Sequence, residues 1–562
     1  MSKVVNSVRT EDARTSNNFF KSDLILQHYL ATYLTPDALD YMTPNLNHLG
    51  EKAALEMDEL SQKADKNSPV LKKRDRWGND CSTIKFHPSY WKLLDIAAES
   101  NMIHVKYEPN LRKQFAANTH MMGFAAGQVY AMSELGIYCP LCMTDGAAYL
   151  VDRYAPRDVK QRILPRLASQ SVQDLYTGAM YLTEKSGGSD VGRNLTTARH
   201  VRDDLYHLEG EKWFCSNANA DIIMALARTG TLNDGIRGLS LFLVEQAGTN
   251  TKENKIETVR LKEKLGVRSM ATGEVIFNNA EAKILSSKGK GFNVMADMIN
   301  ISRLYNAVAA LSGARRGLIE AYQYLNHRII FGKTAIKHTL IREKLTELGS
   351  LHLANQLLVW RAIRAMDKSE HGDGKEAQLL RMLIPMAKWW SAEHAVYMVR
   401  ECMELMGGNG YIEDFVMPKL LRDVNVLPIW EGSGNVIVLD IMRALKKSDG
   451  LNQILNTIKE ETTHLDDDKD KLKIATRLEA IEKTLSKLFD LDKEQAEATA
   501  KPLFKQLIHL YQIGLMLEYH DSTSSRWVDP ALTYMLSAME DDIEIREPMA
   551  TSRIHDLIAW DY

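Results

Sequence analysis

The sequence predicts an α+β protein in which two helical regions flank a β-domain and a helical extension follows. Three observations lead to this prediction. Apolar residues recur at helical spacing in residues 1–176, short runs of strand type occupy 177–287, and the helical period returns in 288–446 and continues through 447–562. Helices, then strands, then helices again is an order that argues against a doubly wound βαβ fold.

The first region is predicted to be helical because its apolar residues are spaced by three and four positions. Residues 89–100 and 157–170 show this spacing and contain few β-branched runs. We therefore expect an N-terminal helical domain over 1–176.

The middle region, 177–287, is predicted to be an antiparallel sandwich or barrel. Several strands separated by turn clusters are typical of such folds. Its apolar runs lie at residues 175–182, 205–214, 221–229, 239–246 and 273–279.

The third region returns to helices, with one apolar stripe formed by Leu318, Tyr322, Leu325 and Ile329. The last region, 447–562, is helical and acidic. It carries 14 Lys and Arg against 23 Asp and Glu, a net charge of -9, and its segment 464–471 is expected to be an exposed connection.

The composition is that of an ordinary globular protein. The 562 residues have a net charge of -3, 45% apolar and 25% charged side chains, which excludes a disordered chain, a collagen-like chain and a surface built wholly for nucleic acid. Five cysteines cannot staple a fold of this size, so we expect a reducing compartment. We find no secretory signal and no transmembrane segment, and predict a cytoplasmic protein.

Two glycine-rich segments are candidates for binding a ligand. Residues 181–190, YLTEKSGGSD, follow the first β-run, and their two glycines let backbone N–H groups approach a ligand closely. A plain polar loop is the alternative. Residues 430–435, WEGSGN, place Glu431 between Trp430 and a glycine, where desolvation makes a carboxylate a usable base. Here Ser433 or Asn435 acting only as a helix cap is the alternative.

Two further motifs are weaker. Residues 210–217, GEKWFCSN, offer an aromatic wall for a planar ring, or simply a half-buried strand. Cys139 and Cys142 form a lone CxxC without a second pair, so we read them as packing residues and predict no metal site.

Together the motifs resemble the acyl-CoA dehydrogenase family of flavoenzymes. LTEKSGGSD, EKWFCSN, EKLGVRS with GEVIFNN, NHRIIFGK, ELMGGNGY and RDVNVLPIWEG occur in the family's order across about residues 75–445. Lys185, the stretch near residue 76 and the extension 447–562 resemble the AidB-like, adaptive-response branch. The resemblance implies a C-terminal four-helix bundle over 288–446 and a homotetramer that binds FAD.

The resemblance also implies the site residues. Glu431 matches the catalytic carboxylate, and Ser189 and Arg303 match substrate-side positions. The positions that match cofactor contacts are Leu182, Thr183, Gly188, Ser189, Phe214, Cys215, Ser216, Arg328, Phe331, Gly407, Gly408, Ser433 and Asn435.

The implied reaction is the α,β-dehydrogenation of an acyl-CoA thioester, with electron-transfer flavoprotein or another acceptor taking the electrons. Three alternatives stay open: an acyl-CoA oxidase, an AidB-like flavoprotein that binds DNA in alkylation protection, and a relative that binds fatty acyl chains without turnover. Nucleic-acid binding through 447–562 is disfavoured by the net charge of -9, because phosphates are held by Lys and Arg.

Overall fold

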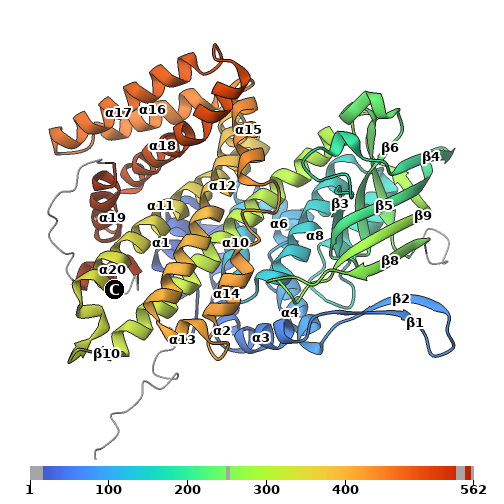
Figure 1. The fold of residues 1–562 in the computed structure, drawn as a ribbon, viewed down its shortest axis with the longest axis horizontal. Coiled ribbons are helices and arrows are strands. Elements are labelled where there is room, and N and C mark those ends of the chain that lie inside the picture. The colour runs from blue at the N-terminus through green and yellow to red at the C-terminus, as the bar shows by residue number, and fades with distance from the viewer. Residues whose placement is uncertain (1–16, 248–253, 540–550, 559–562) are drawn as a thin grey trace, which may run out of the picture. The chain divides into compact units, whose positions relative to one another are not determined.

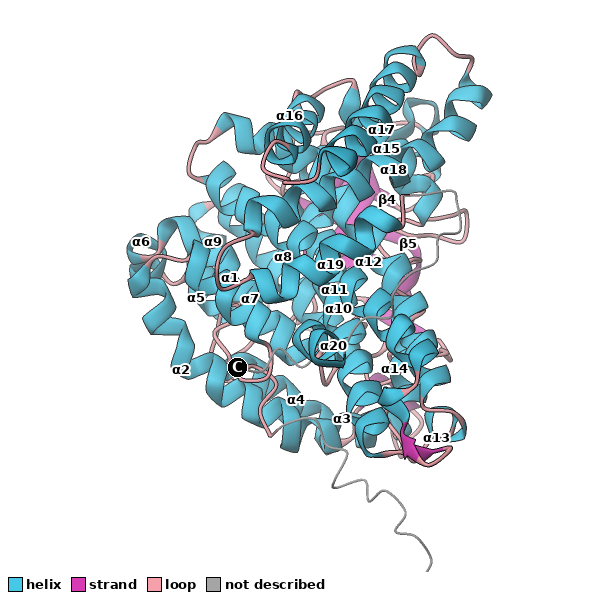
Figure 2. Ribbon diagram, turned by 90° about the vertical axis from the view of Figure 1, so that its left-hand side faces the viewer, coloured by secondary structure: helices cyan, strands magenta, loops and turns pink. Residues whose placement is uncertain are grey.

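The structure is a computed structural model that describes residues 17–247, 254–539 and 551–558. The chain divides into two compact units. The sheet unit comprises Glu56–Gln114 and Ser133–Tyr305, and the helical unit comprises the residues up to Leu55, Phe115–Met132 and the residues from Asn306 onward. Helices account for most of the chain (Figure 2).

The sheet unit is built on a seven-stranded sheet with the order β3-β6-β4-β5-β9-β7, in which β8 pairs with β9 (Figure 1). Because β6 also pairs with β7, the hydrogen-bonded circuit closes from β6 through β4, β5, β9 and β7. The strands are β3 Gly178–Tyr181, β4 Thr197–Arg202, β5 Leu205–Ser216, β6 Ile222–Arg228, β7 Leu239–Glu245, β8 Ile256–Leu261 and β9 Thr272–Ile284.

Each of the five apolar runs of the sequence overlaps a strand, which confirms the middle β-domain. The pairing is mainly antiparallel, but β3 runs parallel to β6 and β4 touches β6 in parallel, so the purely antiparallel prediction was too simple. Strands β4 and β8 were not predicted, because β4 is almost wholly exposed, β8 is only partly buried, and neither has a continuous apolar run.

Helices and one hairpin complete the sheet unit. The hairpin, β1 Val70–Arg74 with β2 Asp80–Lys85, was not predicted, since the first region was expected to be mostly helical. The helices are α3 Asp58–Lys66, α4 Pro88–Glu99, α5 His104–Tyr107, α6 Pro109–Gln114, α8 Leu135–Tyr154 and α9 Arg157–Leu167, with the short 3-10 helices η3 Val191–Arg193 and η4 Leu232–Gly238.

Cys139 and Cys142 lie on α8 with buried, free thiols, as expected for packing residues. Among the described residues no cluster of three or more side chains could hold a metal ion.

The helical unit has long antiparallel helices at its centre. Its elements are α1 Leu24–Tyr33, α2 Pro36–Lys52, α7 Thr119–Ala131, the later part of α10 Gly291–His327, β10 Ile329–Ile330, β11 Lys333–Thr334, α11 Thr339–Glu370, α12 Gly374–Leu405, α13 Gly408–Tyr411, α14 Met417–Val424 and α15 Gly434–Leu445. Short helices η1 Ala53–Met57, η2 Ala116–Asn118 and η5 Ala335–Lys337 connect some of them.

The predicted apolar stripe is correct for three of its four residues. Leu318, Tyr322 and Leu325 are buried on α10. Ile329 is not on the helix, because α10 ends at His327 and the chain turns into β10, where Ile329 is 58% exposed.

The extension is helical, as predicted, and packs within the helical unit. It consists of α16 Gly450–Thr462, α17 Asp468–Lys487, α18 Lys493–Tyr519, α19 Ser525–Ser537 and α20 Thr551–Ile558. Gln512 of α18 donates to Asn355 Oδ1 at 3.1 Å and accepts from Trp390 Nε1 at 3.0 Å. The predicted connection, 464–471, covers most of the link between α16 and α17, and its second half forms the first turn of α17. Within the described part of the chain, no helix is long and apolar enough to span a membrane.

Candidate functional site

The predicted site residues fall into two groups, one in each unit, and each group is described by itself. The sheet unit holds Leu182 to Ser189, Phe214 to Ser216, and Arg303. The helical unit holds Arg328, Phe331, Gly407, Gly408 and the turn from Glu431 to Asn435.

The loop of residues 182–189 is fixed to the sheet by a buried ion pair. The Glu184 carboxylate lies 2.8 Å from the Lys212 ammonium of β5, and both side chains are almost fully buried. The same carboxylate accepts the backbone N–H groups of Leu195 and Thr196 at 2.5 and 3.1 Å. Burial alone raises the pKa of Glu184, but Lys212 and these donors outweigh it and hold the pKa below its ordinary value.

The tip of the anchored loop is exposed to solvent. The carbonyls of Leu182 and Thr183 accept hydrogen bonds from Asn194 at 2.7 Å and from the Trp213 backbone at 2.9 Å. A Cβ at Gly188 would lie 2.8 Å from Thr183 Oγ1, so the loop packs tightly on itself there. Gly188 and Ser189 are exposed, which leaves their backbone and the serine hydroxyl open to a ligand.

A bulge in β5 turns an aromatic side chain outward next to this loop. Lys212 and Cys215 are three residues apart, while their partners on β9 are only two apart, so β5 contains one extra residue here. A bulge redirects side chains, and Phe214 is 58% exposed. Ser216, at the end of the strand, is partly exposed.

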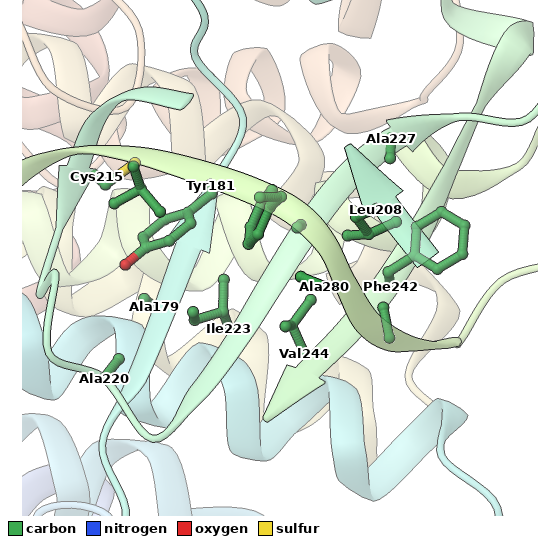
Figure 3. Packing of buried hydrophobic residues seen from close by; sticks show 14 of the residues in the cluster. Ala179, Tyr181, Leu208, Cys215, Ala220, Ile223, Ala227, Phe242, Val244 and Ala280 are labelled. Carbon is green, nitrogen blue, oxygen red and sulfur yellow. The ribbon is translucent and has the colours of Figure 1, made fainter. Parts of the chain in front are cut away.

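Cys215 does not share this orientation. Its side chain is 1% exposed and belongs to the hydrophobic cluster that fills the sheet (Figure 3). Burial raises the pKa of its thiol well above the ordinary value. The Cys215 side chain is therefore part of the hydrophobic core, so only its backbone is left to contact a cofactor.

Lys262 is a feature of this group that the sequence analysis missed. Its Nζ lies 3.4 Å from the centre of the Trp213 ring and 4.9 Å from that of Phe214, and it pairs with Glu274 at 2.6 Å. A cation over both rings stabilises their placement. No spacing rule links residue 262 to 213, because the contact depends on strand pairing. Arg303, by contrast, is buried on α10.

In the helical unit, the turn that carries Glu431 has an unusual backbone. Glu431 has φ of 57° and Gly432 has φ of 101°, both in the left-handed region. Such a conformation at a non-glycine residue is strained and persists where surrounding contacts hold it. The buried Lys388 of α12 makes one such contact, since its Nζ donates to the Gly432 carbonyl at 2.6 Å.

The segment after the turn begins α15. Ser433 occupies the N-cap position, but its side chain makes no capping hydrogen bond and is exposed. The capping interpretation therefore does not account for this serine. Asn435 is exposed too, and its Oδ1 accepts a hydrogen bond from Lys501 of α18 at 3.3 Å.

Gly407 and Gly408 form an open stretch of backbone at the start of α13. Gly407 has φ of 60° and ψ of -141°, which requires glycine, and a Cβ on either residue would meet nothing within 4 Å. Arg328 and Phe331, around the β10–β11 hairpin, are exposed. Phe331 is 95% exposed with φ of 47°. The exposed Phe331 ring is therefore available for contact with a ligand or another chain.

Each group, taken by itself, fits part of a flavin nucleotide. An outward aromatic ring and an exposed hydroxyl suit a planar ring system with polar edges. Open glycine backbone, a helix start and the exposed Arg328 suit phosphate oxygens.

Sequence comparisons match three family profiles along the chain. Residues 10–173 match the N-terminal domain of adaptive response protein AidB. Residues 179–280 and 289–446 match the middle and C-terminal domains of acyl-CoA dehydrogenase.

The similar proteins include nearly full-length relatives. Acyl-CoA dehydrogenase family member 11 of Caenorhabditis elegans is 31% identical over 96% of this chain and 90% of its own. Putative acyl-CoA dehydrogenase AidB of Escherichia coli is 33% identical over 74% of this chain and 76% of its own. The crystal structure of Caenorhabditis elegans ACDH-11 with C11-CoA aligns with a TM-score of 0.88 at 29% identity, covering 99% and 98% of the two chains.

Proposed function

The chain belongs to the acyl-CoA dehydrogenase family, and we propose that it oxidises an acyl-CoA thioester to the α,β-unsaturated thioester with FAD as cofactor. The nearly full-length similarity to relatives named acyl-CoA dehydrogenases supports the reaction class. That a similar solved structure carries C11-CoA supports an acyl-CoA as the substrate.

Each group of residues, taken by itself, is proposed to supply contacts to the cofactor. In the sheet unit, the loop 182–189 and the segment 214–216 supply an aromatic face, hydroxyls and backbone donors. In the helical unit, Arg328, Phe331, the glycines 407 and 408, and the start of α15 supply an aromatic side chain, a cation and backbone donors. Bound FAD supplies the hydride acceptor of the reaction.

Glu431 is proposed to be the base that removes the α-proton of the thioester. The single observation that carries this role is its backbone: a carboxylate on a left-handed turn, beside a glycine whose carbonyl is held by a buried lysine. A proton acceptor must be positioned before its pKa matters. The polar groups that the thioester oxygen meets decide how acidic the α-proton becomes, and one well-aimed donor is worth about 3–4 kcal/mol. We assign Ser189 and Arg303 to the substrate side.

The test is anaerobic mixing of the FAD-loaded protein with acyl-CoAs of increasing chain length. We expect loss of the flavin's visible absorbance with at least one of them, together with the trans-2-enoyl-CoA product. Intact flavin absorbance with every chain length would overturn the dehydrogenase proposal. Reoxidation by electron-transfer flavoprotein without peroxide supports a dehydrogenase, and stoichiometric peroxide from dioxygen would identify an oxidase.

We further propose a homotetramer in the cytoplasm. The exposed apolar side chains of the helical unit support self-association, among them Phe331, Tyr411, Leu340 and Ile429, which are 68–95% exposed. The five cysteines are free, which supports a reducing compartment. Sedimentation that yields a monomer at working concentration would contradict the tetramer.

The DNA-binding alternative is testable by the salt dependence of a gel shift. Binding through phosphates weakens steeply with salt. DNA affinity that persists at physiological ionic strength would displace the dehydrogenase as the main role.

A further inference from the structure

We propose that Lys501, on the C-terminal extension, is a cofactor-binding residue whose ammonium contacts a phosphate of FAD at the start of α15. This inference rests on the proposed function, since it takes FAD as the cofactor. It gives the extension a part in the flavin site rather than a purely structural one.

The first observation is that helix α18 places Lys501 next to the start of α15. Lys501 Nζ lies 3.3 Å from Oδ1 of Asn435, the second residue of α15 and the fourth after Glu431. Both side chains are accessible to solvent. The extension therefore reaches the segment that carries the proposed base and two proposed cofactor contacts.

The second observation is that the charge of Lys501 has no counter-ion. Its neighbours on α18 differ: Lys493 lies 3.9 Å from Glu497, and Lys505 lies 3.9 Å from Glu393. For Lys501, no carboxylate lies within 4.0 Å among the described residues, although the extension carries a net charge of -9.

The third observation is the kind of surface beside the ammonium. The first backbone N–H groups of a helix have no partner within the helix, and its dipole makes this end positive. The Ser433 hydroxyl, at the N-cap, makes no capping hydrogen bond. An uncompensated cation next to a helix start is unfavourable on its own and becomes favourable when an anion lies between them.

Together these groups suit a phosphate: backbone donors, a hydroxyl, an amide and an ammonium on two neighbouring helices. FAD and CoA both carry such phosphates. We assign Lys501 to FAD because Ser433 and Asn435 are the residues proposed to touch the cofactor. The chain's own extension then adds one charge-assisted contact to that nucleotide.

The experiment titrates deflavinated protein with FAD and follows flavin fluorescence. We expect Lys501→Gln to weaken FAD binding about tenfold, which corresponds to about 1.4 kcal/mol, and Lys501→Arg to stay within threefold of the unaltered protein. Raised salt should weaken binding by the unaltered protein more than by Lys501→Gln. The matched control is Lys493→Gln, on the same helix but paired with Glu497, and it should bind FAD normally.

Equal FAD affinity in Lys501→Gln and the unaltered protein would overturn the inference. Normal FAD binding combined with weakened acyl-CoA binding would also overturn it, because Lys501 would then contact CoA rather than FAD. The thermal midpoint of the deflavinated variant, measured by circular dichroism, should match that of the unaltered protein. A lowered midpoint would indicate a structural role and would count against a binding role. If the unaltered protein itself cannot take up FAD, it is the proposed function that fails.

Discussion

Replacing Lys388 by methionine tests how the proposed base is held. The side chain of Lys388 is 1% exposed, and its Nζ donates to the Gly432 carbonyl at 2.6 Å. Methionine keeps the length and apolar stem but removes the charge and the donor. The turn at Glu431 and Gly432, with both φ values positive, then loses a contact that holds it.

The size of the effect follows from that hydrogen bond. A hydrogen bond to a charged group contributes about 1.5–3 kcal/mol. If this energy keeps the Glu431 carboxylate in its working position, its loss raises the barrier for proton removal by a similar amount. Since 1.36 kcal/mol is a factor of ten in rate, we expect flavin reduction to slow by roughly 10- to 150-fold.

The assay is rapid mixing of FAD-loaded protein with a saturating acyl-CoA, followed at the flavin absorbance band. FAD content should stay normal in Lys388→Met. The control is Lys375→Met, on the exposed first turn of the same helix, which should reduce flavin at the unaltered rate. A Lys388→Met rate within twofold of the unaltered protein would refute the positioning role.

Three further changes probe the proposed cofactor residues and the ion pair that anchors the loop 182–189. Glu184→Gln leaves Lys212 charged and buried, so we expect a loss of about 3–5 kcal/mol in the free energy of unfolding. The double variant Glu184→Gln/Lys212→Met should recover part of this loss. An equal loss in both variants would contradict the role of the ion pair. Because the pKa of Glu184 is lowered in the folded state, unfolding in acid takes up a proton, so the free energy of unfolding falls as the pH drops below about 4.5. This fall should be less steep in Glu184→Gln. Urea midpoints measured between pH 3 and 7 would show the difference. Gly407→Ala places a Cβ on a backbone that only glycine favours, at about 1–3 kcal/mol, and should lower FAD retention on gel filtration; full retention would argue against the glycine's role. Phe214→Ala should leave the urea midpoint unchanged, since the ring is exposed, yet alter the flavin absorbance spectrum, and an unchanged spectrum would remove Phe214 from the site.

The order of elements was predictable because each region carries its own local signal. Apolar alternation marks β5 and β9, and three-to-four spacing marks α4 and α10. The misses share one physical cause: β4, β8 and the β1–β2 hairpin are at most partly buried, and such strands have no continuous apolar run that would reveal them. The end of α10 before Ile329 depends on the turn into β10, which apolar spacing does not report.

The candidate site shows the same division. Motifs single out Glu431, Gly407 and the loop 182–189 as candidates, because the residues that would do the chemistry are consecutive in the sequence. The contacts that hold them come from distant parts of the chain: Lys212 to Glu184, Lys388 to Gly432 and Lys501 to Asn435. Such pairs form only when helices and strands pack, so no local pattern in one sequence announces them.

The role of Glu431 is tested most directly by rapid anaerobic mixing of the FAD-loaded Glu431→Gln variant with an acyl-CoA that bleaches the unaltered protein. Glutamine keeps the size of the side chain but accepts no proton at neutral pH. We predict that the variant retains FAD and binds the acyl-CoA, while its flavin stays oxidised over the time in which the unaltered protein is fully reduced. Reduction of both proteins at the same rate would contradict the account.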